Sequence, residues 1–206
     1  MKSKPMLLRK LSAAKQNSNR EAIGVIGTHH GAGTTYTGLM LAFYMGEVLG
    51  RKTAYLECNR HHDMALIQAS YDWSSQEENF FTFHLVTCYK EVTRGQVSQI
   101  LNEEYECVIF DFGINFAQNT EELLRCSMKV VIGGRSEWEQ LKTIRFANML
   151  KNMQGSDSWL YFIPLANSKT IINMKKQIDG KVFSVPFTEE PVLLSRDIRR
   201  FFDHII

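Results

Sequence analysis

The residues with the clearest chemistry are 23–35, which read I-G-V-I-G-T-H-H-G-A-G-T-T. An apolar run ends in a glycine-rich turn, and a helical pattern over residues 36–49 begins at once. In a strand, loop and helix of this kind, backbone N–H groups and the positive end of the helix surround an anion. Gly31 and Gly33 permit the positive φ angles and the close backbone approach that such a loop needs. The pattern predicts a phosphate-binding loop.

The histidines suggest a second kind of chemistry. His29 and His30 lie in the loop, and a cluster reading Cys58-x-x-His61-His62-Asp63 follows the next apolar run. Imidazole, thiolate and carboxylate groups together would suit zinc or another transition metal. However, adjacent histidines on a loop point in different directions, and no closed C-x-x-C…H-x-x-x-H spacing is present. A milder alternative is that His29 or His30, partly protonated, lends charge to a bound phosphate.

Strand and helix patterns alternate along the chain and must position these residues. The predicted strands are 23–26, 53–56, 80–88, 105–110, 129–132, 159–163 and 182–185, and the predicted helices are 36–49, 64–71, 96–101, 121–126, 138–149, 170–178 and 192–206. This order favours an α/β fold, namely a three-layer, doubly wound, mostly parallel sheet with helices on both faces. Ser136 and Glu139 have the spacing of a helix-capping box.

The last predicted helix resembles a membrane-binding helix only superficially. Its apolar residues share one face, but Asp197 and Asp203 offset its three arginines to a net +1. We therefore expect it to pack on the core rather than on a membrane.

The composition predicts one domain over residues 21–206. The chain has 206 residues, of which 44% are hydrophobic, enough for a sizeable core. The net charge of +2 gives no signal for nucleic acid or a membrane as partner. Residues 1–20 carry six basic and no acidic side chains, which leaves −4 for the rest. This segment is predicted to be a basic N-terminal tail or a surface helix.

Cysteine usage and hydropathy predict a soluble, cytoplasmic protein. Four scattered cysteines in mostly apolar surroundings are typical of reduced, packed thiols: Cys58, Cys88, Cys107 and Cys126. The basic start is followed by only three apolar residues, too few for a signal peptide. The longest apolar stretch, residues 39–45, is far shorter than the about 20 residues of a membrane span.

With Asp111 at the end of an apolar strand and Val185-Pro186 near the end of the chain, the loop makes the sequence resemble the MinD/ParA group of P-loop NTPases. This group belongs to the wider SIMIBI class with nitrogenase iron protein and dethiobiotin synthetase. The resemblance covers residues 21–206. The loop of the group reads K-G-G-x-G-K-[ST], and here the same positions read His29-His30-Gly31-Ala32-Gly33-Thr34-Thr35. Gly31, Gly33 and Thr35 match, whereas His29 and Thr34 replace the two lysines.

The resemblance implies a site for ATP or ADP with magnesium. Nucleotide-binding residues would be His29, His30, Gly31, Ala32, Gly33, Thr34 and Thr35, with Asn167 and Pro186 near the base. Thr35 and Asp111 would be the magnesium pair, and Asp111 would begin the segment that senses the γ-phosphate. Glu57-Cys58-Asn59 takes the place of an Asp-x-Asp that helps to position magnesium in the group.

The missing lysines bear on catalysis. Each would make a charge-assisted contact to phosphate worth about 1.5–3 kcal/mol and would neutralise charge in phosphoryl transfer. The resemblance therefore implies a degenerate nucleotide-binding protein with weak or no ATP hydrolysis, a P-loop pseudo-ATPase near the atypical TadZ group. It would regulate or position a bacterial assembly of the pilus, secretion or partitioning type, with protein partners and a possible homodimer.

Two alternatives stay open. The chain could be an active ATP-dependent enzyme of the ParA or dethiobiotin synthetase kind, in which Arg60, Arg135 or a residue of a dimer partner supplies the missing charge. It could also be a structural adaptor whose loop binds no nucleotide.

Overall fold

The structure is a computed structural model that describes residues 20–71, 77–153, 155–186 and 188–206. The predicted basic segment 1–20 lies outside these residues except for Arg20. The Arg20 guanidinium donates hydrogen bonds to the carbonyl oxygens of Tyr105 at 2.9 Å, of Glu103 at 2.7 Å and of Leu101. These bonds fix the start of the first strand against the segment that leads into the Asp111 strand.

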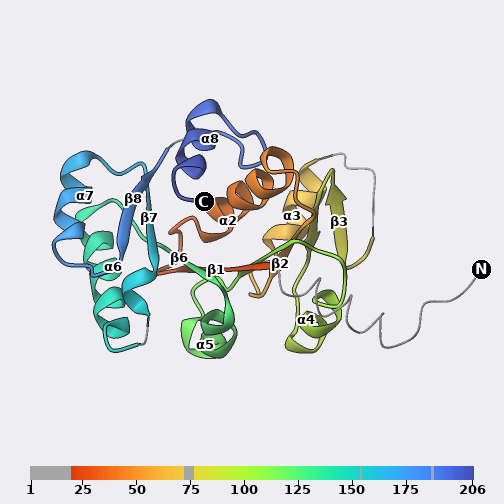
Figure 1. Cartoon of the computed structure of the whole chain (residues 1–206), viewed down its shortest axis with the longest axis horizontal. Coiled ribbons are helices and arrows are strands. Elements are labelled where there is room, and N and C mark those ends of the chain that lie inside the picture. Colours follow the sequence, from red (N-terminus) through yellow and green to blue (C-terminus); the bar gives the residue numbers. More distant parts are fainter. Residues whose placement is uncertain (1–19, 72–76, 154, 187) are drawn as a thin grey trace, which may run out of the picture.

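The described residues form one eight-stranded sheet in the order β3-β4-β2-β5-β1-β6-β7-β8 (Figure 1). Every neighbouring pair is parallel except the edge pair β3 and β4. The predicted mostly parallel α/β class is confirmed. The strands are β1 Glu21–Gly27, β2 Thr53–Glu57, β3 Phe80–Phe83, β4 Val86–Tyr89, β5 Cys107–Asp111, β6 Met128–Ile132, β7 Leu160–Pro164 and β8 Lys181–Val185.

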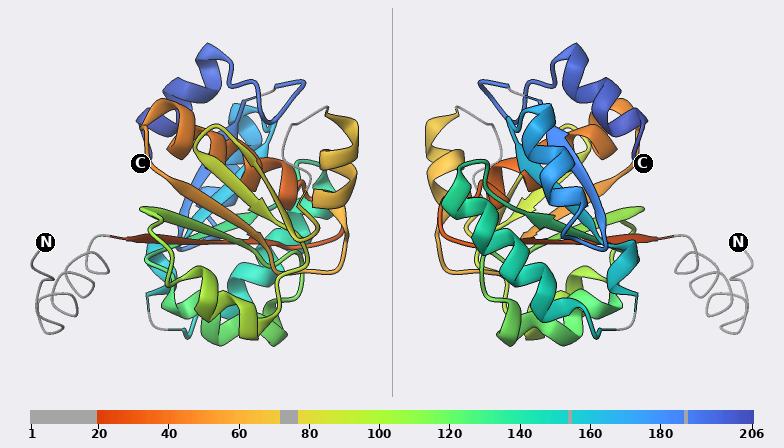
Figure 2. Two further views of the ribbon diagram at one scale, coloured as in Figure 1. Left: turned by 90° about the vertical axis from the view of Figure 1, so that its right-hand side faces the viewer. Right: turned by 90° about the vertical axis from the view of Figure 1, so that its left-hand side faces the viewer.

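Helices cover both faces of the sheet, as Figures 1 and 2 show. One buried cluster joins the sheet to α2, α3 and α8, and a second joins the other face to α4, α5, α6 and α7. The helices are α2 Thr34–Phe43, continued by a π-helical turn at Tyr44–Val48, α3 Asp63–Ser70, α4 Arg94–Ile100, α5 Phe116–Arg125, α6 Glu137–Leu150, α7 Ser168–Lys175 and α8 Arg196–Asp203, with a 3₁₀ turn at Ser156–Ser158.

The prediction of a single strand over residues 80–88 is wrong. The segment is a hairpin in which β3 and β4 pair antiparallel, from Phe80 opposite Tyr89 to Phe83 opposite Val86. His84 has a φ of 50° in the two-residue turn, a conformation that histidine adopts more readily than most residues. Because His84 and Leu85 carry no glycine or proline signal, the reversal is hidden in an apolar run.

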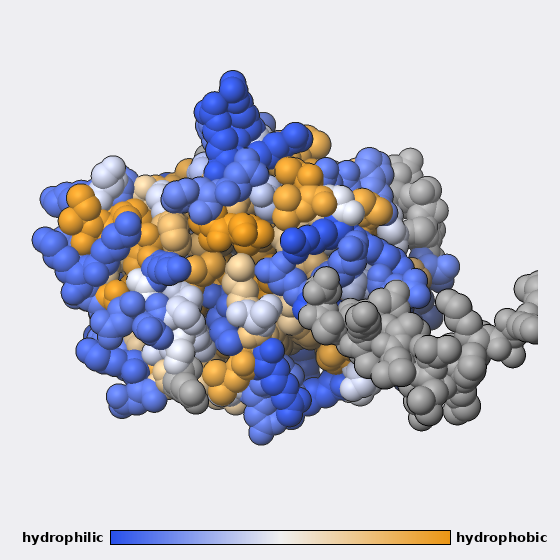
Figure 3. All heavy atoms as spheres, viewed as in Figure 1, coloured by the Kyte–Doolittle hydropathy of each residue, from blue (hydrophilic) through white to orange (hydrophobic). Residues whose placement is uncertain are grey.

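The last helix is shorter than the predicted 192–206 because the Ser195 side chain caps its first turn, accepting a hydrogen bond from the Ile198 N–H at 3.3 Å. Ile198 and Phe202 are fully buried. The Tyr44 hydroxyl donates to Asp203 at 2.7 Å. The predicted core packing is confirmed, and the surface over α8 in Figure 3 is hydrophilic.

The four cysteines are all free, and Cys88, Cys107 and Cys126 are buried, as the sequence predicts. Among the described residues, no helix has both the length and the apolar character needed to cross a membrane.

Candidate functional site

The loop between β1 and α2 has the backbone that the sequence predicts. Gly31 and Gly33 adopt left-handed conformations with φ of 78° and 87°, and Gly33 is the N-cap residue of α2. A Cβ atom on Gly31 would meet no atom within 4 Å, so the space over the loop is open. Unpaired N–H groups at the start of α2 therefore face a position that an anion can occupy.

Thr34, at one of the lysine positions, packs down onto the base of the loop. It is buried, and a Cβ atom on Gly27 would lie 2.2 Å from its Oγ1. Only glycine at position 27 allows this close approach, which keeps the end of β1 against the start of α2. The Thr34 hydroxyl therefore supports the loop and carries no charge toward a ligand.

Thr35 stands between two carboxylates. Its Oγ1 lies 2.7 Å from Oδ2 of Asp111 and 3.0 Å from Oδ2 of Asp63, so its single proton is available to only one of them at a time. The Tyr55 hydroxyl also donates to Oδ2 of Asp111, at 2.8 Å. The Gly113 N–H donates to the other carboxylate oxygen at 2.9 Å. The structure thus brings together Thr35 and Asp111, the predicted pair, and adds Asp63 and Tyr55.

Burial dominates the electrostatics of this cluster. Asp111 is completely buried, and burial raises its pKa above the ordinary value, although three hydrogen bonds lower it and nearby Asp63 raises it further. Burial, with the neighbouring Asp111 charge, also raises the pKa of Tyr55 far above its usual value. Among the described residues, neither Asp63 nor Asp111 forms an ion pair. A hydroxyl and two carboxylates without a cation are a donor set that fits magnesium.

Residues 57–59, at the end of β2 and just after it, have a different role from the one that the resemblance implies. Glu57 is buried, and its carboxylate accepts hydrogen bonds from the backbone N–H groups of Met64 at 3.3 Å and Glu91 at 3.1 Å. Asn59 donates from its side chain to the Asp111 carbonyl at 3.2 Å and accepts from the His61 N–H at 3.0 Å. These residues hold the loop before α3 against the end of β5, and Asp63, the first residue of α3, reaches Thr35.

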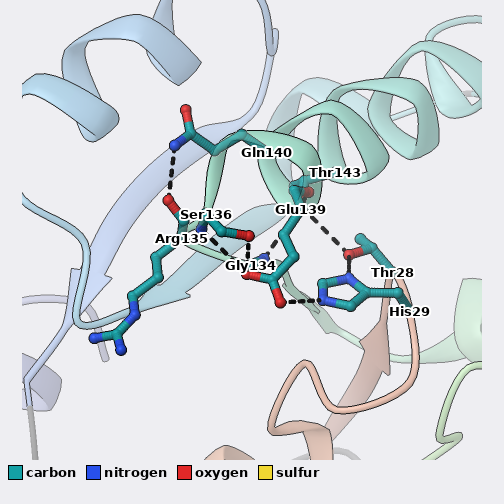
Figure 4. Close-up of polar contacts among 8 residues, drawn as sticks. All are labelled: Thr28, His29, Gly134, Arg135, Ser136, Glu139, Gln140 and Thr143. Atoms are coloured by element: carbon teal, nitrogen blue, oxygen red, sulfur yellow. Dashed lines mark hydrogen bonds and ion pairs between the residues drawn. The ribbon is translucent and has the colours of Figure 1, made fainter.

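His29, at the other lysine position, turns away from the loop and toward α6 (Figure 4). Its Nδ1 lies 2.9 Å from the Thr28 hydroxyl and its Nε2 lies 3.5 Å from a Glu139 carboxylate oxygen. Its side chain is only 8% exposed. Glu139 also accepts from the backbone and hydroxyl of Ser136, and this confirms the predicted capping box. The His29 ring therefore ties the first half of the loop to the N-terminus of α6.

The arginines of the alternative interpretation lie at the surface. Arg60 and Arg135 are both exposed, and neither forms an ion pair within the part of the chain that the structure describes. Figure 4 shows the Arg135 side chain directed away from His29 and Glu139.

Asn167 and Pro186 lie on neighbouring segments at the same edge of the sheet. Asn167 is the N-cap of α7, and its Oδ1 accepts from the Thr170 N–H at 2.9 Å. Pro186 directly follows β8. The segment after β7 lies beside it, because the Ser184 hydroxyl of β8 donates a hydrogen bond to the Ala166 carbonyl at 2.7 Å. Because β7 and β8 lie two and three strands from β1, and β5 adjoins β1 on its other side, these residues and Asp111 flank the loop from opposite sides.

A cavity of about 410 Å³ opens beside Thr35 and Asp63. It lies between α2, α3 and the segment that leads into α8, and Leu39, Ile67 and Val192 line it. The Tyr36 hydroxyl donates to the Thr188 carbonyl at 2.6 Å and holds this segment over the start of α2. The cluster at Thr35 is therefore accessible from this side.

The structure gives no support to a transition-metal site. Within the described residues, no three histidine, cysteine, aspartate or glutamate side chains converge in a way that could hold a metal ion. His29 faces Glu139, whereas the Nδ1 of His62 lies 2.6 Å from Glu91, so these two histidines contact different acidic residues and do not share a site. The ring centroids of His30 and His61 are 5.9 Å apart.

Sequence comparisons found no relatives: no family model matches the chain, and no curated protein sequence matches it significantly. Solved structures do match. MinD in a MinC:MinD cell division complex from Aquifex aeolicus has a TM-score of 0.66 at 10% identity, over 89% of this chain and 96% of that one.

A plasmid partition protein from Borrelia burgdorferi, bound to AMPPNP, has a TM-score of 0.65 at 9% identity, over 91% of this chain and all of that chain (100%). MinD from Pyrococcus horikoshii, complexed with Mg-ADP, has a TM-score of 0.60 at 14% identity and 81% coverage of both chains. The chain has the P-loop NTPase fold of the MinD and ParA proteins.

Proposed function

We propose that this protein binds a magnesium nucleotide at residues 29–35 and hydrolyses it slowly or not at all. The observation that carries the proposal is the Thr35 hydroxyl held at 2.7 Å from Asp111, directly after an open glycine loop. Magnesium would be held by Thr35 and Asp111, and it would neutralise phosphate charge there. The proteins of similar fold bound to AMPPNP and to Mg-ADP support this proposal.

Weak hydrolysis follows from the side chains at the two lysine positions. Thr34 packs against Gly27 and His29 pairs with Glu139, so neither brings a fixed positive charge over the loop. Phosphoryl transfer depends mainly on electrostatic stabilisation of charge in the transition state. Binding depends less on these side chains, because the backbone N–H groups of the loop also hold an anion.

The cellular role that fits such a protein is regulation or positioning within a bacterial assembly, of the partitioning or of the pilus and secretion type. One matching structure is a complex of MinD with MinC, and another is a plasmid partition protein. These matches support the proposal that nucleotide binding at this site controls contacts with partner proteins. For the protein itself we propose a homodimer, the commonest symmetric assembly.

The test is a calorimetric titration of ADP and ATP with magnesium, run with a phosphate-release assay. Wild type is expected to bind both nucleotides, and Thr35→Val is expected to weaken binding when magnesium is present but not with EDTA. Turnover near 1 s⁻¹, which is within the usual enzyme range of about 1–10³ s⁻¹, would favour the alternative of an active enzyme. In that case Arg60→Gln or Arg135→Gln should abolish turnover.

A further inference from the structure

The two lysine positions leave the loop without a side-chain cation, yet two other histidines stand beside it. His30 belongs to the loop itself and His61 to the segment between β2 and α3, and their ring centroids are 5.9 Å apart at an angle of 50°. Both side chains are exposed. His29 and Thr34 stand at the two lysine positions of the loop in the sequence only. In space, it is His30 and His61 that face each other.

Three other histidines contact acidic side chains. His29 pairs with Glu139, His62 with Glu91 and His84 with Glu47. Among the described residues, His30 and His61 pair with no carboxylate. Their ring N–H groups are therefore available to an anion that enters the loop, because no carboxylate within the described part of the chain competes for them.

The position of His61 is set by buried groups near Asp111. Asn59 accepts from the His61 N–H at 3.0 Å and donates to the Asp111 carbonyl at 3.2 Å. The His61 Cε1 atom lies 3.2 Å from the place that a Cβ atom on Gly113 would take. His61 therefore packs against the backbone that follows Asp111, and any side chain at position 113 would displace it.

The strand order indicates which end of a bound nucleotide the two histidines would meet. Asn167 and Pro186 lie beyond β1 toward β7 and β8, and His61 lies on the opposite side, at the ends of β2 and β5. If the base lies toward Asn167 and the phosphates cross the loop, the phosphate farthest from the base comes to His30 and His61.

We propose that His30 and His61 donate hydrogen bonds to the terminal phosphate of a nucleoside triphosphate and so make the site prefer triphosphate over diphosphate. This inference rests on the proposed nucleotide binding. A charge-assisted hydrogen bond to phosphate corresponds to about a tenfold or greater change in affinity. The discrimination comes from imidazole groups on two separate loops, so a triphosphate also holds the β2–α3 segment to the phosphate loop.

The experiment measures dissociation constants for ATP and ADP, each with magnesium, by calorimetry on wild type, His30→Gln, His61→Gln, the double variant and Arg60→Gln. His84→Gln is the matched control, because His84 is also exposed but lies on the β3–β4 hairpin. Each single substitution is expected to weaken ATP binding about tenfold and ADP binding less than about threefold. Unfolding temperatures of all variants check that the fold is kept.

Three outcomes would overturn the inference. Equal losses for ATP and ADP would place the histidines elsewhere on the ligand, and unchanged affinities would remove them from the site. A loss of ATP preference in Arg60→Gln, with the histidine variants unaffected, would assign the role to Arg60. Wild type that binds neither nucleotide would contradict the proposed function itself, which separates that failure from a failure of the histidine pair alone.

Discussion

Asp111→Asn is expected to stabilise the protein in the absence of magnesium. The carboxylate is completely buried, and burial raises its pKa despite hydrogen bonds from Gly113, Thr35 and Tyr55. Its ionisation near neutral pH therefore costs folding free energy. An asparagine keeps an acceptor for the Gly113 N–H, and its amide group can donate to the hydroxyl oxygens of Thr35 and Tyr55. The two hydroxyl protons then have other acceptors, because Thr35 can donate to Asp63 at 3.0 Å and Tyr55 to the Thr35 carbonyl at 3.4 Å.

The size of the gain can be bounded. Single stabilising substitutions commonly add about 0.5–2 kcal/mol to the free energy of unfolding, and we expect a gain in this range. For a chain of this length, about 1 kcal/mol corresponds to a rise of about 2–4 °C in unfolding temperature. Asp179→Asn, which removes an exposed carboxylate 3.6 Å from Lys151, is the control. It is expected to change stability by less than about 0.5 kcal/mol.

The pH dependence has a definite sign. Because folding raises the pKa of Asp111, the folded state holds more protons than the unfolded state from about pH 3.9 upward to the folded pKa. The contribution of Asp111 to stability is present below this window and is lost as the pH rises through it. The advantage of Asp111→Asn should therefore grow as the pH rises from about 4 through the folded pKa, and it is measured from pH 4 to pH 8.

The assay is thermal unfolding of both proteins with EDTA and with magnesium, across this pH range. Magnesium should stabilise wild type by mass action and the variant much less. A variant that unfolds at a lower temperature than wild type at pH 8 in EDTA would refute the electrostatic reasoning.

Other substitutions test separate parts of the structure. Tyr55→Phe removes a hydroxyl that donates to buried Asp111, and it should lower the free energy of urea unfolding by about 1.5–3 kcal/mol. The loss should be smaller in the Asp111→Asn background. An equal loss there would show that the two residues are not coupled. Glu139→Ala should lower the free energy of unfolding by about 1 kcal/mol, because it removes part of the α6 cap. Glu139→Gln retains a capping oxygen and should lose less than half of that. Equal losses would assign the effect to the contact of Glu139 with His29. Phe202→Ala should cost about 3–5 kcal/mol in thermal unfolding, because Phe202 is fully buried between α8 and the core; a change below 1 kcal/mol would contradict this packing.

Much of the fold could be predicted from the sequence because its signals are local. The apolar runs and the glycines of the loop determine strands and turns over a few residues, and the Ser136–Glu139 spacing specifies its own cap. The β3–β4 hairpin was missed because His84 and Leu85 carry no turn signal in an apolar run. The length of the last helix was missed because apolar spacing continues past both of its ends.

The site was predictable only in part, because its contacts join distant segments. Thr35 and Asp111 are 76 residues apart, and their proximity follows from the adjacency of β1 and β5. Tyr55 reads as one more apolar strand residue, and nothing local shows that its hydroxyl meets a carboxylate. In the sequence Asp63 belongs to a histidine cluster, and its contact with Thr35 depends on how α3 docks. The turn of His29 toward Glu139 likewise depends on packing between the loop and α6.

A crystal structure of the protein grown with ADP and magnesium would test the central claim most directly. We expect density for a diphosphate over Gly31, Gly33 and Thr35, with a cation beside the Thr35 hydroxyl and Asp111. A saturated crystal in which this loop is empty, or in which the nucleotide occupies another surface, would contradict the account.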